Sequence, residues 1–390
     1  MIRIPAIPAV LLAVTSLTGC QVLTTPATPP KGLKPTELQL ERAVLVGPMD
    51  QDKKTEQEEQ SRVTLRQTVI QTPTFINGKL LVGLAETGYL PDFDLELEAK
   101  IDTGATRTSI DARNLQRFER DGRKWVQFEL HRTNRDAVPM ELPIKDSILI
   151  KRPDSEPQER LVVGLTVRIG NITQQLDVSL NDRTRYTYPL LIGRDFLQDM
   201  AVADVSKKGI AVERPLETIT RQVTPEEYKT AKPVVEKQVD VNGLELLGAL
   251  ESVRLDNSEK SFKARIDTGA LTSSLDARDL ETFDKGGKQW VRFKLASDSE
   301  AAIIELPITR MVEIKRHGEL ESEERPVVTM SVKLGNIFKP TEFSLRDRSE
   351  YDYPVLIAER FLKEAALVDV SQEYIADKAL NTLSTPRGHQ

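Results

Sequence analysis

The sequence predicts an all-β protein with a few short helices, built from two copies of one domain. Segments of strand composition alternate with two-residue turn motifs, helical periodicity is rare, and a long stretch of sequence recurs 165 positions later. Many short strands joined by tight turns favour a closed or a sandwiched β architecture. We therefore predict two tandem β-rich domains.

The composition excludes several classes of function. Of the 390 residues, 39% are hydrophobic and 29% are charged, so the chain can bury more than one core. The formal net charge of −6 disfavours a nucleic-acid partner, since such proteins present a basic face. One cysteine and three histidines are too few for a zinc site of the usual ligands, and no phosphate-binding loop motif occurs. We therefore expect no metal and no cofactor.

Residues 1–20 are typical of a lipoprotein export signal. Arg3 provides the positive end, residues 7–17 are mostly apolar, and the small residue Gly19 directly precedes Cys20. An apolar run this short is a signal core rather than a membrane span. The ending resembles a lipobox, at which bacterial lipoproteins are cut and acylated, so Cys20 is the expected lipidation site. The alternative is a plain signal peptide with a chance cysteine.

Lipidation of Cys20 implies a membrane anchor in the cell envelope. Gln21 follows the cysteine, where lipoproteins kept at the inner membrane more often carry Asp. By resemblance we expect the outer membrane, facing the periplasm. Residues 21–75 are predicted to be a disordered tether, because prolines remove backbone donors and the polar stretch 51–60 cannot offset its ordering entropy. Residues 62–70 have the composition of a short strand or helix.

An internal duplication organises the rest of the chain. Repeat one covers residues 76–214 and repeat two residues 241–371, with a linker at 215–240 and a tail at 372–390. Each repeat is about the size of one domain. The clearest matches are 99–105 with 264–270, 111–113 with 276–278, 125–126 with 290–291, 170–172 with 335–337, and 188–189 with 353–354.

Turn and capping motifs predict the elements inside each repeat. The pairs Asp121-Gly122 and Gly286-Gly287 predict hairpins, each followed by a Trp-Val-x-Phe strand. Short helices are predicted over residues 111–118, with an aspartate cap, and over residues 194–200. The two hairpins are candidate flaps over a cleft.

The tryptophans of these hairpins, Trp125 and Trp290, have two interpretations. They could contact substrate, but a core position is the commoner role of a tryptophan in such a strand. We expect them in the core.

Each repeat carries an Asp-Thr-Gly-Ala loop at the end of an alternating strand. The loops are Asp102, Thr103, Gly104 and Ala105 in repeat one, and Asp267, Thr268, Gly269 and Ala270 in repeat two. A glycine beside the carboxylate permits a sharp turn and close approach of another backbone or a substrate. Two carboxylates brought together cannot both ionise easily, so one keeps a proton. Such a pair can activate a water molecule against a peptide carbonyl.

The Asp-Thr-Gly-Ala loop and a later Gly-Arg-Asp-Phe-Leu element together resemble retropepsin-like aspartic peptidases. The whole repeat is similar to a bacterial family labelled as ATP-dependent zinc proteases, whose fold is retropepsin-like and which is often associated with glutamate-ligating enzymes. The resemblance covers residues 76–214 and 241–371, and it implies two tandem retropepsin-like closed β-barrel domains. Composition disfavours both the zinc and the ATP of that label.

The resemblance implies an aspartic endopeptidase with Asp102 and Asp267 as its catalytic residues. The implied bracing and loop-shaping residues are Thr103, Gly104, Ala105, Thr268, Gly269 and Ala270. The two alanines stand where pepsin-like enzymes usually carry Ser or Thr. With one hydrogen bond fewer to the charged form, the pair should be less acidic than in pepsin.

The second family element differs between the repeats. In repeat one it supplies the supporting residues Gly193, Arg194 and Asp195, and in repeat two the same positions hold Ala358, Glu359 and Arg360. The extra methyl group of Ala358 is expected to lie beside the catalytic loop and to displace Asp267 slightly. Repeat two is therefore a candidate degraded half.

Alternatives remain open from the residues alone. The loops could be plain turns, which would leave a catalytically inactive binding or scaffold module of the envelope. The repeats could pair within one chain as a monomer, which tethering favours, or between chains as a homodimer.

The implied partner is a peptide or protein substrate, and the association with glutamate ligases makes an acidic peptide a candidate. Candidate receivers for its carboxylates are Arg107, Arg183, Arg265 and Arg348. Arg183 and Arg348 could instead stabilise their own loops.

Overall fold

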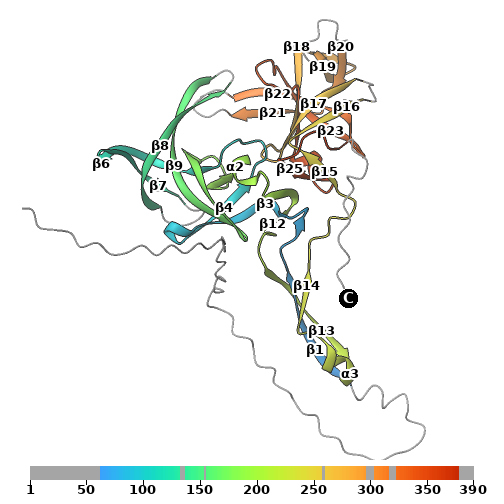
Figure 1. The fold of residues 1–390 in the computed structure, drawn as a ribbon. Coiled ribbons are helices and arrows are strands. Elements are labelled where there is room, and N and C mark those ends of the chain that lie inside the picture. The colour runs from blue at the N-terminus through green and yellow to red at the C-terminus, as the bar shows by residue number, and fades with distance from the viewer. Residues whose placement is uncertain are drawn as a thin grey trace, which may run out of the picture. The chain divides into compact units, whose positions relative to one another are not determined.

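The computed structural model describes residues 62–131, 137–152, 155–256, 260–295, 303–315 and 322–376. Strands dominate these ranges, with short helices between some of them (Figure 1). Cys20 and the signal and tether residues up to 61 lie outside them. No helix in the described ranges is long and apolar enough to cross a bilayer.

Repeat one is a closed barrel of six strands, ordered β3-β4-β11-β5-β10-β9, with β9 pairing back onto β3. Its alternating strands bury one face, as in Leu95, Leu97 and Ala99 of β4. The elements are β2 (Phe75–Ile76), β3 (Lys79–Leu90), η1 (Pro91–Phe93), β4 (Leu95–Ile101), β5 (Ser109–Asp111), β6 (Arg113–Arg120), β7 (Arg123–Leu130), β8 (Val138–Arg152), β9 (Ser155–Ile169), β10 (Ile172–Asn181), β11 (Leu190–Ile192), α2 (Arg194–Leu197) and β12 (Ala201–Lys208).

Repeat two closes in the same way, in the order β16-β17-β24-β18-β23-β22 with β22 pairing onto β16. The prediction of two tandem closed barrels is therefore confirmed. The elements are β15 (Glu245–Gly248), β16 (Leu250–Leu255), β17 (Ser261–Asp267), β18 (Ser273–Lys285), β19 (Lys288–Leu295), β20 (Ile303–Pro307), β21 (Arg310–Lys315), β22 (Ser322–Leu334), β23 (Ile337–Arg346), β24 (Val355–Ala358), α4 (Glu359–Leu362) and β25 (Ala366–Asp369).

A shared sheet joins the repeats. Strands β3 and β12 of repeat one continue into β25 and β15 of repeat two, and the central pair is Ala203 with Val368. These two residues are equivalent positions of the duplication, so the pseudo-two-fold axis passes between them. One core cluster runs through both barrels, and a second, with Leu81 and Leu367, packs on the sheet. The intramolecular arrangement therefore has a continuous apolar interior.

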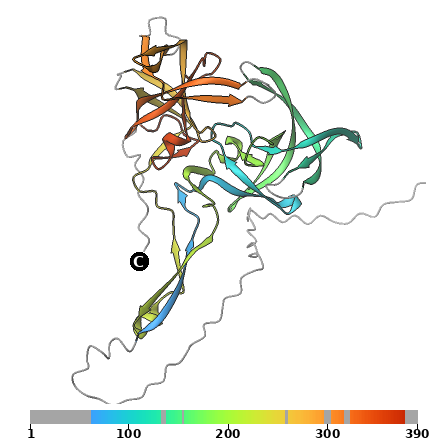
Figure 2. The same cartoon turned by 180° about the vertical axis from the view of Figure 1, so that it is seen from behind.

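The tether and linker boundaries predicted from the sequence need correction. Residues 63–71 form β1 (Val63–Gln71), which pairs with β13 (Arg214–Val223) and β14 (Val234–Lys237) from the expected linker. Helix α3 (Pro225–Thr230) lies between these two strands in sequence, capped by the Thr224 hydroxyl. Figure 2 shows blue β1 and yellow-green β13 and β14 together in one narrow ribbon. The partners come from distant parts of the chain, which local composition cannot reveal.

Residues 111–118, predicted as a helix, are strands β5 and β6. Asp111 is buried and does not cap a helix, because its carboxylate accepts the Arg183 N–H at 2.7 Å and the Arg113 guanidinium. The helix predicted over 194–200 is confirmed but shorter, at residues 194–197. Both predicted hairpins form, and Asp121 and Gly122 adopt the positive φ values of 52° and 69° that such a turn requires.

The start of the expected tail is also structured. Ile375 and Ala376 are buried, and their N–H groups donate to the buried carboxylate of Glu251 at 3.2 Å each. Glu86, the equivalent residue of repeat one, accepts the N–H groups of Ile210 and Ala211 in the same way. The second repeat therefore continues beyond its predicted end at residue 371.

Candidate active site

Both aspartate loops begin where a barrel strand ends. Asp102 follows β4 and donates its N–H to Ile192 O of the neighbouring strand β11 at 2.9 Å. Asp267 is the last residue of β17 and pairs with Ala358 of β24. The strand ladders therefore fix the backbone of both carboxylates.

The two loops meet through their threonines, which form a reciprocal set of four buried hydrogen bonds. The Thr103 N–H donates to Thr268 Oγ1 at 2.9 Å, and the Thr268 N–H donates to Thr103 Oγ1 at 3.0 Å. Each hydroxyl then donates to a strand carbonyl of the opposite repeat, Ile266 O at 3.0 Å and Ile101 O at 2.9 Å. The bracing role implied by the resemblance is what this geometry provides.

The glycines bring each carboxylate against the opposite loop. A methyl group placed on Gly104 would overlap all three carboxyl atoms of Asp267, and one on Gly269 would overlap those of Asp102. The two aspartates from different repeats are therefore part of one site. The small size of glycine at both positions is what allows it.

The pair perturbs the ionisation of Asp102. Burial, and next the negative charge of Asp267, raise the pKa of Asp102 to about 6 from its ordinary 3.8. The N–H of Ala105, which donates to Asp102 Oδ1 at 2.9 Å, and the charge of Lys100 act in the opposite direction. A carboxyl group of this kind is protonated over a range in which an ordinary aspartate is charged.

Asp267 is held by its own loop in a similar way. Its Oδ1 accepts the N–H of Gly269 at 2.8 Å and of Ala270 at 3.1 Å. The alanines at 105 and 270 therefore contribute backbone N–H groups to the carboxylates, although they lack the hydroxyl of a Ser or Thr.

Two cations cross between the repeats at this site. Lys100 Nζ donates to Gly269 O at 2.8 Å, and Arg265 Nη2 donates to Gly104 O. The sequence prediction did not include Lys100. Comparison of the repeats could have found it, since a basic residue stands two positions before each aspartate.

The element with Gly193, Arg194 and Asp195 supports the loop of repeat one. Arg194 Nη1 donates to Thr103 O at 3.2 Å and to Gly104 O at 3.3 Å. The Asp195 carboxylate accepts the N–H and the hydroxyl of Thr108. An added methyl group on Gly193 would lie only 2.6 Å from the Arg107 carbonyl carbon, so this packing requires glycine.

Repeat two accommodates Ala358 with the same backbone contacts. The Ala358 N–H donates to Ser273 Oγ at 3.1 Å, as the Gly193 N–H does to Thr108 Oγ1 at 3.1 Å. The Glu359 N–H donates to Ala270 O at 3.0 Å, against 2.9 Å for the equivalent pair of repeat one. These contacts give no sign of the expected displacement of Asp267. Arg360 instead forms an ion pair with Glu342 at 2.8 Å.

Most of the arginines considered as substrate receivers are engaged elsewhere. Arg183 and Arg348 are buried; each donates to a tyrosine carbonyl and a serine hydroxyl of its own repeat. Burial lowers the pKa of both, to about 10 for Arg348. These contacts favour the loop-stabilising alternative for this pair. Arg107 donates to Asp177 O at 3.1 Å from an exposed position.

The tryptophans are not core residues. Trp125 is partly buried, stacks on Phe118 with ring centroids 6.3 Å apart, and lies under Arg120. In the same strand Val126 and Phe128 face the core, so Trp125 is on the opposite face. The core prediction for the tryptophans is therefore wrong, because an aromatic and cationic cluster on the hairpin covers the indole.

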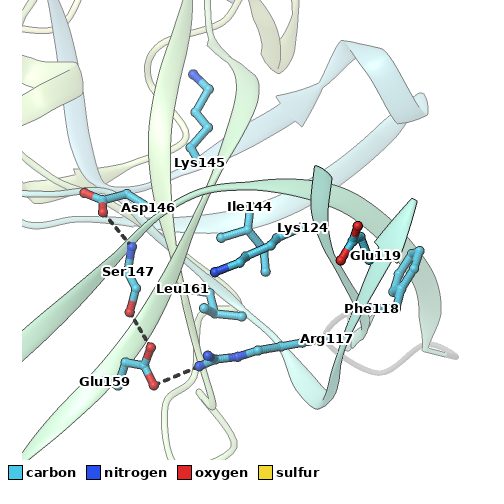
Figure 3. A pocket seen from close by; sticks show the side chains of 10 residues that line it. All are labelled: Arg117, Phe118, Glu119, Lys124, Ile144, Lys145, Asp146, Ser147, Glu159 and Leu161. Atoms are coloured by element: carbon cyan, nitrogen blue, oxygen red, sulfur yellow. Dashed lines mark hydrogen bonds and ion pairs between the residues drawn. The ribbon is translucent and has the colours of Figure 1, made fainter. Parts of the chain in front are cut away.

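A pocket of about 530 Å³ lies beside the first hairpin, away from the aspartates (Figure 3). Arg117 and Lys124 of the hairpin point into it, and Ile144 and Leu161 line it from β8 and β9. Its residues belong to neither aspartate loop. Among the described residues, no group of three or more His, Cys, Asp or Glu side chains is placed to hold a metal ion.

Comparisons with known proteins agree with this architecture. The profile of the RimB-like family, described as retropepsin-like aspartic endopeptidase RimB, matches residues 81–214 and 246–379. A Desulfotalea psychrophila protein named probable alpha-L-glutamate ligase is 28% identical over 155 residues, which are 39% of this chain and 33% of that protein. A Shewanella pealeana protein of the same name is 27% identical over 135 residues, 34% of this chain and 30% of that protein.

This chain thus spans about a third of the length of these curated relatives. A solved Legionella pneumophila protein of unknown function is 30% identical, with a TM-score of 0.30, and the match covers 34% of this chain and 97% of that one. The two regions matched by the family profile contain both barrels and both aspartate loops. The chain belongs to the RimB-like family of retropepsin-like aspartic endopeptidases, as two tandem copies.

Proposed function

We propose that this protein is an aspartic endopeptidase that hydrolyses peptide bonds with a water molecule activated by Asp102 and Asp267. The observation that supports this most strongly is the reciprocal packing of each carboxyl group against the glycine of the opposite loop. The hydrogen bonds between Thr103 and Thr268 hold the two loops in that arrangement. One site therefore forms from the two repeats of a single chain.

The proposed chemistry needs one proton on the pair. The charged carboxylate accepts a proton from water as the water oxygen attacks the peptide carbonyl carbon, and the protonated carboxyl gives its proton to the carbonyl oxygen. Proton transfer to the peptide nitrogen then accompanies cleavage of the C–N bond. No covalent enzyme intermediate forms. The raised pKa of Asp102 supports its role as the proton donor at mildly acidic pH.

An acidic peptide is the proposed substrate class. Lys100, Arg194 and Arg265 lie around the two carboxylates and give the site more positive than negative charge. The curated relatives are named as glutamate ligases, and a ligase that adds glutamate produces an acidic peptide. We further propose that lipidated Cys20 anchors the protein at the outer membrane, facing the periplasm.

Hydrolysis of a peptide library by the purified protein tests the activity, with glutamate-rich peptides compared against neutral peptides of equal length. Asp102→Asn and Asp267→Asn should each abolish cleavage, whereas Asp146→Asn, a change on exposed β8, should leave it intact. Cleavage that survives in both catalytic-site variants would exclude the mechanism.

The alternative is a catalytically inactive binding module, which the alanine at position 358 favours. It predicts no turnover by the wild type on any library, together with a partner whose binding is unaffected by the Asp→Asn changes. The contacts of Ala358 match those of Gly193, so the structure gives little support to the hypothesis that repeat two is degraded.

A further inference from the structure

Lys100 and Arg265 occupy an unusual position for basic side chains, two residues before each aspartate. In β4 the residues Leu97, Ala99 and Ile101 face the barrel interior, so Lys100 points outward. Arg265 has the same place in β17, between the buried residues Ala264 and Ile266. At the ends of these strands, a side chain that points out of its own barrel reaches the opposite repeat.

Each cation contacts the glycine that packs against its own aspartate. Lys100 donates to Gly269 O at 2.8 Å, and Gly269 is the residue on which the Asp102 carboxyl lies. Arg265 donates to Gly104 O, and Gly104 is the residue on which the Asp267 carboxyl lies. In each repeat, the basic residue and the aspartate therefore contact the same glycine of the other repeat. The basic side chain donates to the glycine carbonyl, and the carboxyl group packs against the glycine.

We propose that Lys100 and Arg265 are positioning residues, which fix the opposite glycine and thereby set the spacing of the two carboxyl groups. This proposal rests on the proposed function in that the aspartate pair is the reactive site. It extends that function, because it assigns a catalytic constraint to two residues outside the Asp-Thr-Gly-Ala loops.

The other charged groups around the pair donate within their own repeats. Arg183 interacts electrostatically with Asp102, and Arg348 with Asp267, while both hydrogen-bond to their own tyrosine loops. Arg194 interacts with both aspartates and with Tyr353, and hydrogen-bonds to the loop of repeat one. Lys100 and Arg265 differ from these arginines because their hydrogen bonds cross from one repeat to the other.

The charged groups around the Lys100–Gly269 contact and the Arg265–Gly104 contact also differ. Gly104 O accepts both Arg265 and Arg194, and position 359, the counterpart of Arg194, holds a glutamate. The charge of Lys100 lowers the pKa of Asp102 against the effect of burial. Removal of Lys100 should therefore change both the geometry and the proton affinity of the pair.

Titration of carboxyl carbons by NMR in aspartate-labelled protein tests the proposal without any need for turnover. Lys100→Met should raise the pKa of Asp102 by about 0.5 unit or more, whereas Lys145→Met, which removes an exposed lysine paired with Asp177, should leave it unchanged. Spectra of the Asp102→Asn and Asp267→Asn variants assign the resonances.

Turnover then separates the positioning role from general stability. Arg265→Met should lower kcat about tenfold or more with little change in KM, because misplaced catalytic groups slow chemistry rather than binding. Arg265→Lys should restore kcat, since lysine serves at the equivalent position of repeat one. Thermal unfolding of each variant shows whether a loss of kcat follows a loss of fold.

An Asp102 titration in Lys100→Met that matches the Lys145→Met control would overturn the proposal, as would full kcat in Arg265→Met. If Lys100→Met does not fold, Lys100→Gln retains a donor without the charge and gives the same titration test. A wild type that cleaves no peptide would defeat the proposed function alone, because the titration still reports on the brace.

Discussion

The substitution Thr103→Val tests the energetic contribution of the threonine hydrogen bonds. Thr103 is 1% exposed, and its hydroxyl donates to Ile266 O and accepts the Thr268 N–H, both at 3.0 Å. Valine has nearly the same shape but leaves these two groups buried and unpaired. At about 1–3 kcal/mol for each group, the loss in the free energy of unfolding should be about 2–6 kcal/mol.

Thr103→Ser is the matched control, because it keeps the hydroxyl and removes only a methyl group. Its expected cost is about 1 kcal/mol. Thr268→Val should cost as much as Thr103→Val, since the Thr268 hydroxyl makes the two equivalent hydrogen bonds, both at 2.9 Å.

Urea unfolding followed by tryptophan fluorescence measures these differences repeat by repeat. The chain has two tryptophans, one in each repeat, so Trp125→Phe and Trp290→Phe backgrounds report repeat two and repeat one separately. The reasoning is refuted if Thr103→Val loses no more stability than Thr103→Ser in either background.

Three further outcomes are expected. Because the pKa of Asp102 is raised from 3.8 to about 6, its charged form is disfavoured in the fold, and this cost is absent below pH 4 and complete above pH 6. Asp102→Asn should therefore stabilise the protein by about 3 kcal/mol at pH 7 but not at pH 3.5, as thermal unfolding at both values would show. Gly104→Ala should reduce peptide hydrolysis about 100-fold or more, because the methyl group overlaps Asp267; unchanged kcat would contradict the packing. Leu244→Lys should stabilise the fold by about 1 kcal/mol in urea, since Asp204 Oδ2 is buried without a partner among the described residues; a lower midpoint would argue against it.

The last expectation follows from a difference between the repeats. Lys79 donates to the Asp369 carboxylate of repeat two at 2.7 Å, and position 244 is the equivalent of Lys79. Asp204 is the equivalent of Asp369 and has no matching lysine.

The candidate site could be predicted from the sequence because it depends on short, contiguous motifs. Asp102 and Asp267 each end an alternating strand, and the duplication identifies them as equivalent. The structure brings both predicted loops together with their threonines and glycines. The closed barrels were predictable for the same reason, since period-two alternation and tight turns are local features.

Features that depend on distant partners were not predictable. Strand β1 pairs with β13 and β14, which lie more than a hundred residues away in the sequence. Its local composition does not reveal these partners and is compatible with a tether. Asp111 has the sequence of a helix cap, but the backbone N–H that it accepts belongs to Arg183. Lys100 resembles any outward residue of a strand until the opposite repeat is placed beside it.

The central claim is that one carboxyl group from each repeat shares a single site. The most direct measurement is the pKa of Asp102 by carboxyl-carbon NMR in the wild type and in Asp267→Asn. We predict a value of about 6 in the wild type and a clearly lower value in the variant, because the variant lacks the Asp267 charge. An Asp102 pKa that is the same in both proteins would show that the two aspartates do not interact, and would contradict the account.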